Sequence, residues 1–250
     1  MRRDLRLEQL RAEVRAIAAA GKDAAAVLPF GIEAVDGRLA GGGLADAGVH
    51  EVAAATAGFS DDAAATLFLA GIAGRRAGTQ GTVLWVMARR DLFAPGLALG
   101  GLAPERLLVA EAGRDPDVLA VMEEGLRHGA LAAVVGEVGA AGLTETRRLQ
   151  LAAEEGGTLA LLHRRWRKGD PLSAPSTALT RWRIGSAPSE PLPVAGVGRA
   201  CWQVELARQR GGPSFSLILE ACDAQGRLAL PALSHNRPDQ AGAGEWRRAA

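Results

Sequence analysis

The residues between Glu51 and Asp61 have an order of elements that is typical of phosphate-binding sites. The stretch EVAAATAGFSDDAAATLFLA, residues 51–70, is predicted to form a strand end, a turn of small residues and a helix. In a P-loop, this order lets backbone N–H groups of the turn and the helix start bind phosphates. A working P-loop also needs further glycines, a lysine for the β- and γ-phosphates and a hydroxyl for magnesium.

This loop lacks the lysine and has a single glycine, Gly58. The two lysines of the chain, Lys22 and Lys168, lie in other segments. Asp61 and Asp62 stand where the helix would meet a phosphate. Each like-charge contact at ~4 Å and an effective dielectric of ~20 costs about 4 kcal/mol. We therefore predict that the two carboxylates cap the helix themselves and that no nucleotide cofactor binds. The vestigial P-loop consists of Ala54, Gly58, Ser60, Asp61 and Asp62.

Hydrolysis of a nucleotide would also need an acidic residue at the end of a neighbouring strand to hold magnesium. Glu137 is placed there, because LAAVVGEV, residues 131–138, is predicted to be a strand. Without the lysine, we interpret Glu137 as a vestige of such a magnesium site with a structural role. No metal site is predicted either, because His50 and His163 have no cysteine or aspartate at ligand spacing.

The elements that must position this loop alternate between strands and helices. Continuous apolar runs predict buried parallel strands at 49–53, 81–87, 106–112, 131–138 and 158–166. Helical patterns lie between them at 61–76, 115–129 (with Asp115 as N-cap) and 144–157. From Thr180 onward, strands follow without helices, and the last two form a hairpin. We predict an α/β fold with a doubly wound, mostly parallel sheet flanked by helices and antiparallel strands at its C-terminal edge.

Composition sets limits on the domain organisation and the location of the protein. With 250 residues, 48 % of them hydrophobic, the chain can bury one full core. No stretch approaches the ~20 apolar residues of a membrane span, and the N-terminus lacks the features of a secretion signal. Two cysteines and no signal predict a cytoplasmic protein. The predicted organisation is an N-terminal helix with its linker (1–28), a core domain (29–230) and a flexible tail (231–250).

The predicted N-terminal helix carries an apolar stripe formed by Leu7, Leu10, Val14 and Ile17. Their three- and four-residue spacing places them on one face of an amphipathic helix over residues 3–20. Two interpretations stay open. The stripe docks on a partner or on another copy of the chain, or it packs back on the chain's own core.

The order of these segments resembles the RecA core and, more specifically, the ImuA family of RecA-like accessory proteins in bacterial mutagenic translesion synthesis. The resemblance covers about residues 27–230 and is most specific at LPFGIEAVDGRLAGGGLADAGVHEV, which ends with Glu51 and Val52 at the predicted strand end. The chain length and the vestigial loop fit the ImuA family better than RecA itself. The resemblance implies a RecA-like core.

The catalytic residues of RecA carry over poorly to this chain. Its P-loop lysine and threonine are matched by Ser60 and Asp61, its catalytic glutamate by the vicinity of Arg89, and its Walker B aspartate by the vicinity of Glu137. An arginine at the position of the base cannot orient an attacking water. The resemblance therefore implies a pseudo-ATPase without catalytic residues, which acts as an adaptor in translesion synthesis after DNA damage, within the SOS response.

The same resemblance implies the partners. They are an inactive ImuB-type homologue of Y-family polymerases and an error-prone replicative-type DNA polymerase, with RecA or another copy as a further partner of the N-terminal helix. Two alternatives stay open: a SulA-like inhibitor of cell division that binds the division GTPase, and a divergent RecA-like ATPase. The long approach to the loop and a basic stretch farther along the chain favour the ImuA family over SulA.

That basic stretch is HRRWRKGDPLSAPSTALTRWRI, residues 163–184. Arginine binds phosphate in a bidentate manner, and indole rings stack on bases. One interpretation is a surface for DNA or a protein partner, and the other is a solvated strand face beside a buried one. Since the net charge of the chain is only +1, DNA binding through this patch is expected to be weak and sensitive to salt. The candidate residues are Arg164, Arg165, Trp166, Arg167, Lys168, Arg181 and Arg183.

Overall fold

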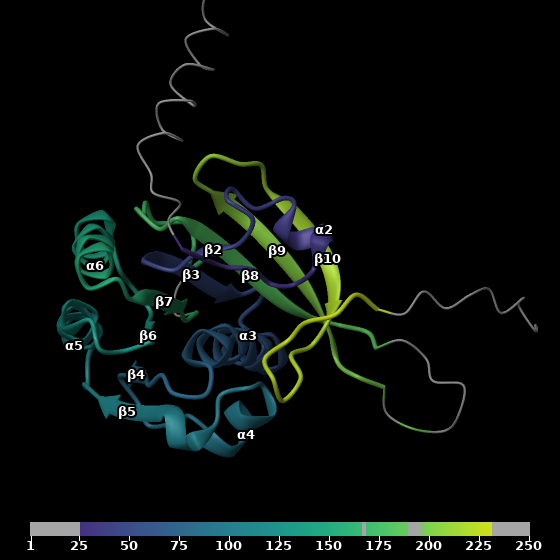
Figure 1. The fold of residues 1–250 in the computed structure, drawn as a ribbon, viewed down its shortest axis with the longest axis horizontal. Helices are drawn as coiled ribbons and strands as arrows, with labels where there is room; N and C mark the ends of the chain where they lie inside the picture. Colours follow the sequence, from purple (N-terminus) through teal and green to yellow (C-terminus); the bar gives the residue numbers. More distant parts are fainter. Residues whose placement is uncertain (1–25, 167–168, 190–195, 197, 232–250) are drawn as a thin grey trace, which may run out of the picture.

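The computed structural model describes residues 26–166, 169–189, 196 and 198–231. Their main feature is an eight-stranded sheet with the strand order β10-β9-β8-β3-β7-β6-β4-β5 (Figure 1). Neighbouring strands from β8 to β5 are parallel, while β9 and β10 are antiparallel. This arrangement confirms the predicted fold class. The strands are β3 (Gly48–Ala54), β4 (Val83–Met87), β5 (Leu107–Glu111), β6 (Ala133–Val138), β7 (Leu159–Arg164), β8 (Thr180–Ala187), β9 (Cys201–Gln209) and β10 (Phe215–Glu220).

Helices cover both faces of this sheet (Figure 1). They connect the parallel strands, because each such connection must return from the end of one strand to the start of the next. On one face lie α3 (Phe59–Ala77) and α4 (Ala94–Leu99), followed by the short η1 (Pro104–Arg106). On the other face lie α5 (Asp115–His128) and α6 (Leu143–Gly156). None of the helices in the described ranges is long and apolar enough to cross a membrane.

The segment that leads into β3 forms a small substructure of its own. β1 (Val27–Leu28) pairs with β2 (Leu44–Ala45) in antiparallel register, and α2 (Glu33–Asp36) lies between them in the chain. The Asp36 carboxylate accepts hydrogen bonds from three successive N–H groups before α2, at 2.7–3.2 Å. These bonds fix the approach of the chain to the sheet, since they satisfy donors that the short helix leaves free.

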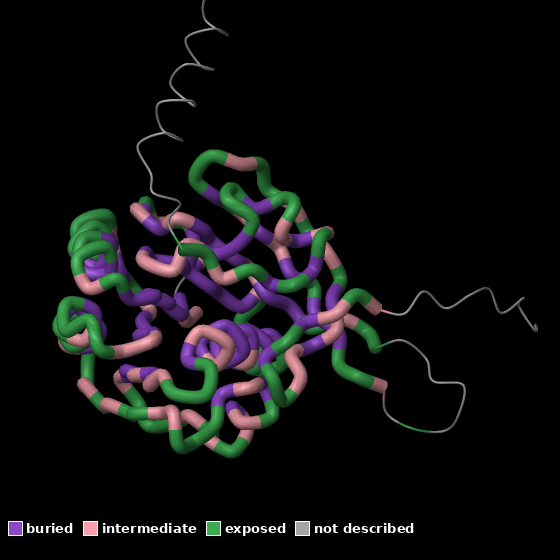
Figure 2. Tube along the Cα trace, in the orientation of Figure 1, coloured by how far each residue is buried: buried purple, intermediate pink, exposed green. Residues whose placement is uncertain are grey.

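The core consists of two clusters of buried apolar residues, one on each face of the sheet. Buried residues are concentrated along the strands of the sheet (Figure 2). Alternation along β4 shows how one strand serves both layers, since Trp85 packs on the α3 side and Val86 on the side of α5 and α6. Phe68 of α3 and Trp182 of β8 are fully buried on the first side, with ring centroids 5.8 Å apart. Complete burial of such side chains stabilises the fold by about 1.5–3 kcal/mol each.

Two local predictions need correction, and others lie outside the described residues. Glu51 lies in the middle of β3, not at the strand end, and is fully buried. The N-cap of α5 is Arg114, so Asp115 is the first helical residue, and its carboxylate instead accepts hydrogen bonds from two N–H groups after β6. The predicted N-terminal helix with Leu7, Leu10, Val14 and Ile17 falls outside the described ranges, as does the predicted tail apart from Pro231.

Candidate functional site

The segment between β3 and α3 is the predicted vestigial P-loop. β3 ends at Ala54 and α3 begins at Phe59, which leaves residues 55–58 for the turn. Gly58 is the N-cap, with an extended backbone (φ −74°, ψ 146°), and no side-chain hydrogen bond caps the helix. The prediction that Asp61 and Asp62 cap α3 is therefore wrong. Both residues lie in the first turn, but their carboxylates bind other groups.

Asp61 ties the loop to β8. Its carboxylate accepts hydrogen bonds from the Thr56 hydroxyl at 2.6 Å and from the backbone N–H and hydroxyl of Ser186 at 2.8 and 2.7 Å. The Ser186 hydroxyl also lies 3.3 Å from that of Ser60. Burial opposes ionisation of Asp61, but the donors outweigh it together and hold the pKa of this carboxyl below its ordinary value. A phosphate at this point would meet a fixed negative charge.

Arg165 gathers three carboxylates at the carboxyl ends of the parallel strands. It directly follows β7 and forms ion pairs with Asp62 of α3, with Glu137 at 3.0 Å and with Asp91 at 3.4 Å. Burial alone would lower the pKa of Arg165, but the three carboxylates raise it above its ordinary value. The guanidinium is thus a permanent positive charge within the cluster, which would otherwise hold three negative charges close together.

Glu137 lies near the end of β6, as the sequence predicts, and is 5 % exposed. In addition to Arg165, it binds the indole N–H of Trp85, which donates a hydrogen bond at 2.7 Å. Burial raises the pKa of Glu137 above its ordinary value, in spite of the opposing effects of Arg165 and Trp85. Both carboxylate oxygens have protein partners, and one of these partners comes from the core.

His163 of β7 lies beside this cluster and is fully buried. Burial, followed by the charge of Arg165, lowers its pKa to about 3, so the imidazole is neutral at pH 7. Its Nε2 atom lies 3.6 Å from Asp62, and neither ring nitrogen has a hydrogen-bond partner among the described residues. No group of side chains in the described ranges has the composition of a metal site.

The space that remains beside the loop is small. Trp166 donates its indole N–H to the carbonyl oxygen of Ala54 at 2.9 Å and so holds the end of β3. Pockets that bind cofactors typically have volumes of ~300–1,000 Å³. The pocket beside Arg165 and Trp166 has about 50 Å³, which is below this range. Its lining consists of Ala88, Arg89, Asp91, Glu137, Gly139, Arg165 and Trp166.

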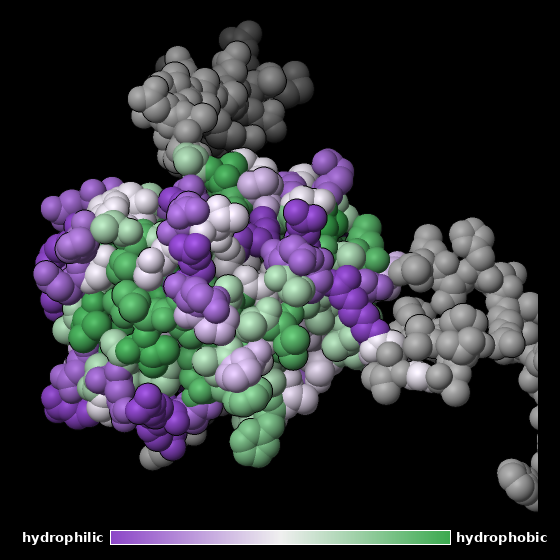
Figure 3. Space-filling model, turned by 60° about the horizontal axis from the view of Figure 1, so that its bottom comes forward, coloured by the Kyte–Doolittle hydropathy of each residue, from purple (hydrophilic) through white to green (hydrophobic). Residues whose placement is uncertain are grey.

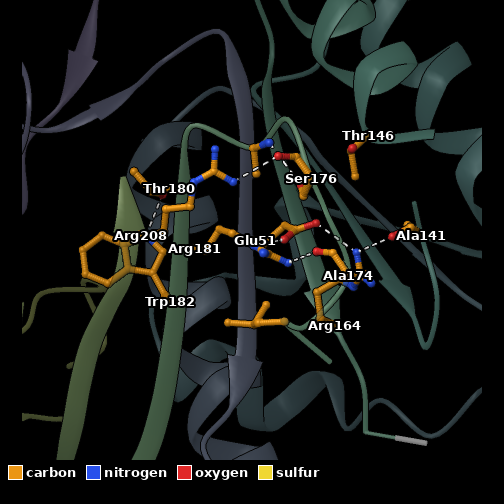
Figure 4. A network of polar contacts seen from close by, with 12 residues as sticks. Glu51, Ala141, Thr146, Arg164, Ala174, Ser176, Thr180, Arg181, Trp182 and Arg208 are labelled. Carbon is orange, nitrogen blue, oxygen red and sulfur yellow. Dashed lines mark hydrogen bonds and ion pairs between the residues drawn. The ribbon is translucent and has the colours of Figure 1, made fainter. Parts of the chain in front are cut away.

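Two candidates of the predicted basic surface are buried in an ion-pair triad (Figure 4). Arg164 of β7 and Arg181 of β8 flank Glu51 of β3, with nitrogen–oxygen distances of 2.9 and 2.6 Å. Glu51 is 0 % exposed, and the side chains of the two arginines are 2 % and 8 % exposed. The prediction of a surface role is therefore wrong for both arginines. Glu51 lies in β3, between β7 and β8, and pairs with both arginines. This pairing is needed because an unpaired buried charge is very costly.

The other candidates of the basic stretch are only partly available. Arg183 pairs with Asp170 at 2.6 Å and its side chain is 23 % exposed, whereas that of Arg165 is 25 % exposed. Arg167 and Lys168 lie outside the described residues. The described part of the stretch therefore presents no free row of arginines, since each of its four described arginines has a carboxylate partner.

The residues that the sequence analysis missed are the partners of the predicted ones. Glu51 carries a usable signal, because an acid within the apolar run GVHEVAA marks a buried charge that needs an arginine. Asp91 and Ser186 carry no such signal, since they are polar residues at exposed positions, Asp91 in a loop and Ser186 in a strand. They reach the site only because the sheet order places β4, β6, β7 and β8 around β3 and α3.

Comparison with known proteins gives one clear relationship. No family model matches the chain. It is 41 % identical over 211 residues to Protein ImuA from two strains of Caulobacter vibrioides, NA1000 / CB15N and ATCC 19089 / CIP 103742 / CB 15. The match covers 79 % of this chain and 84 % of each relative. The crystal structure of SulA from Pseudomonas aeruginosa is also similar, with 25 % identity and a TM-score of 0.40, over 47 % of this chain and 98 % of that chain. The extent and identity of the first match show that this chain belongs to the ImuA family.

Proposed function

We propose that the protein is a non-catalytic RecA-like adaptor in DNA-damage-induced translesion synthesis. In this role it binds an inactive ImuB-type homologue of Y-family polymerases and supports an error-prone replicative-type polymerase. Membership of the ImuA family supports a role in damage-induced mutagenesis, since the relatives at 41 % identity are named ImuA. The assignment of individual partners follows from the resemblance described above.

One observation carries the pseudo-ATPase part of the proposal: the polar groups of the loop are already bound to each other. Asp61 is held by Thr56 and Ser186, and Asp62 is paired with Arg165. A nucleotide would have to break these contacts and place its phosphates beside two carboxylates. At ~4 Å and an effective dielectric of ~20, each phosphate–carboxylate contact costs about 4 kcal/mol. Catalysis also requires a lysine, which the loop lacks.

Two contacts suggested by the sequence have different places in this proposal. Direct DNA binding through Arg164 and Arg181 is excluded from it, because Glu51 holds both side chains inside the sheet. The apolar stripe of Leu7, Leu10, Val14 and Ile17 stays a predicted contact for the polymerase homologue, for RecA or for another copy. Removal of residues 1–25 tests this contact, with retention of the polymerase homologue as the readout.

Calorimetric titration with ATP and magnesium, run beside a pull-down on the same purified chain, tests the proposal. We expect no heat of binding and capture of the ImuB-type homologue. Micromolar affinity for ATP would contradict the pseudo-ATPase assignment and favour a divergent ATPase. Capture of the division GTPase in place of the polymerase homologue would contradict the adaptor role and favour a SulA-like inhibitor. The two arms therefore test the two parts of the proposal separately.

A further inference from the structure

The outer edge of β5 offers backbone hydrogen-bonding groups to a further strand. β5 is the last strand on its side of the sheet and pairs with β4 alone among the described strands. Directly after β5, the N–H of Ala112 donates to the carbonyl oxygen of Met87 at 2.9 Å. Because the backbone groups of successive strand residues point to opposite sides, those of Leu107, Val109 and Glu111 point away from β4. These three residues therefore present unpaired donors and acceptors in one row.

The side chains along this edge are apolar and exposed on both faces of the sheet. Leu108 is 54 % exposed and is in register with Leu84, whose side chain packs on the side of α5. Val109 is 47 % exposed and is in register with Trp85, which packs on the side of α3. Figure 3 shows the side of the molecule that carries β5 and α4, and hydrophobic residues gather there. An exposed apolar patch of this kind is typical of an interaction site.

This edge lacks the usual protection against strand pairing. Edge strands are normally protected by charged residues, proline, a bulge or a covering segment. The register between β4 and β5 is continuous, and residues 107–110 are all apolar. The opposite edge of the sheet differs, because Glu220 of β10 forms a bridge with Ala229 of the following segment. No described segment covers β5 in this way, so its edge is available to a partner.

The charges around β5 favour a basic partner. Residues 104–128, from η1 to the end of α5, contain six carboxylates and three arginines. Arg114 and Arg127 are already paired with carboxylates of α5. Glu105 and Glu111 lie on either side of the apolar residues of β5, and both are exposed. Neither of them forms an ion pair within the part of the chain that the structure describes. Basic residues at the ends of a bound segment would meet these carboxylates.

We propose that the free edge of β5 binds an extended segment of a protein partner, apolar in its middle and basic at its ends, which adds a strand to the sheet. In strand addition, main-chain hydrogen bonds supply affinity and alternate side chains supply specificity. The backbone of the segment bonds to Leu107, Val109 and Glu111, and its apolar side chains cover Leu108 and Val109.

This site goes beyond the proposed function, because it does not depend on which protein supplies the segment. Loss of the polymerase homologue in the pull-down with peptide binding retained would overturn the partner and leave the edge. The reverse result would overturn the edge alone.

Fluorescence anisotropy of labelled octapeptides with the full chain tests the site. One set has Arg at both ends and Val, Ile and Leu between them, and a matched set has Glu in place of each Arg. Two further sets are N-methylated on alternate residues, one on the odd and one on the even positions. Only one of these two sets loses the N–H groups that face β5, while both keep the same side chains.

Three variants of the chain complete the experiment. Val109→Pro removes an N–H that points away from β4, at a kind of position where edge strands accept proline. Leu108→Arg places a positive charge within the apolar edge. Ile218→Arg is its matched control, because Ile218 is 45 % exposed and lies in β10, the strand at the opposite edge of the sheet.

We expect members of the Arg set to bind the parent chain and the Ile218→Arg control equally. Binding should weaken about tenfold or more, equivalent to ~1.4 kcal/mol, with Val109→Pro, with Leu108→Arg, with the Glu peptides and with one N-methylated set. No binding of any Arg peptide, equal binding of the two N-methylated sets, equal binding of the Arg and Glu sets, or full affinity in either β5 variant would each overturn the proposal. Self-association in sedimentation velocity that Val109→Pro abolishes would assign the edge to a second copy and would also overturn it.

Discussion

The buried triad predicts a large loss of stability from a small chemical change. Glu51→Gln keeps the size and one hydrogen-bond acceptor of the side chain but removes its charge. The carboxylate lies at 2.9 Å from Arg164 and 2.6 Å from Arg181, with all three groups almost completely buried. Two guanidinium groups would then be left in the sheet with no counter-charge between them.

The magnitude follows from this geometry. At an effective dielectric of ~20 and ~4 Å between charge centres, each ion pair contributes about 4 kcal/mol of Coulomb energy. Removing one partner of a buried ion pair costs about 3–5 kcal/mol, because the other charge stays buried. Since domains are stable by only ~5–15 kcal/mol, Glu51→Gln should remove a large part of the free energy of unfolding. Replacing the whole triad by Leu, Met and Leu should cost much less, since no charge is left behind.

Urea denaturation followed by tryptophan fluorescence measures the effect, because Trp85 and Trp182 are fully buried and report on both halves of the sheet. With an m-value of ~2 kcal/mol per molar, the midpoint should fall by about 2 M. Glu105→Gln is the matched control at an exposed position, and its midpoint should change little. Equal midpoints for the two variants would refute the conclusion that Glu51 is the necessary counter-charge of the buried arginines.

Three further predictions concern the neighbourhood of the loop. The folded-state pKa of His163, about 3, lies below its ordinary value of 6.5, so acid should destabilise the chain by up to ~1.4 kcal/mol per pH unit below pH ~6.5. Urea titrations at several pH values should show a shallower pH dependence of stability in His163→Gln. The exposed control His128→Gln should keep the pH dependence of the parent chain. Trp166→Phe should speed amide hydrogen exchange in residues 54–58, since it removes the bond to the end of β3; unchanged exchange would contradict this. Gly74→Ala should cost about 1–3 kcal/mol in urea titration, because its Cβ would lie 2.1 Å from a carbonyl oxygen of the loop after α4.

The sheet was predictable because its signals are local. Apolar runs such as VLWVM and AVVGEV have the length and composition of buried parallel strands, and the change after Thr180 marks the antiparallel part. The hairpin shows the limit of this approach. The sequence predicts the hairpin, but its register depends on the exact position of the turn. The turn occupies Arg210 and Gly211, so Cys201 lies opposite Glu220, and both described cysteines are free. A difference of one residue in the turn changes every cross-strand pair.

The candidate site was less predictable, because its chemistry depends on contacts between distant segments. The sequence identifies Asp61 and Asp62 as obstacles to phosphate binding. It predicts that they cap their own helix, because the helix start is the only binding partner that lies next to them in the sequence. Asp61 also binds Ser186, and Asp62 pairs with Arg165, each more than one hundred residues away in the chain. Likewise, the alternation of arginine and tryptophan in RWR fits a surface strand, and only the buried Glu51 of the neighbouring strand reverses that interpretation for Arg181.

The same contacts make the loop an unfavourable place for a ligand. Around the loop, Asp61 accepts a hydrogen bond from Thr56, and Asp62 pairs with Arg165. Trp166 donates a hydrogen bond to the carbonyl oxygen of Ala54. A ligand at the loop would therefore have to replace existing bonds.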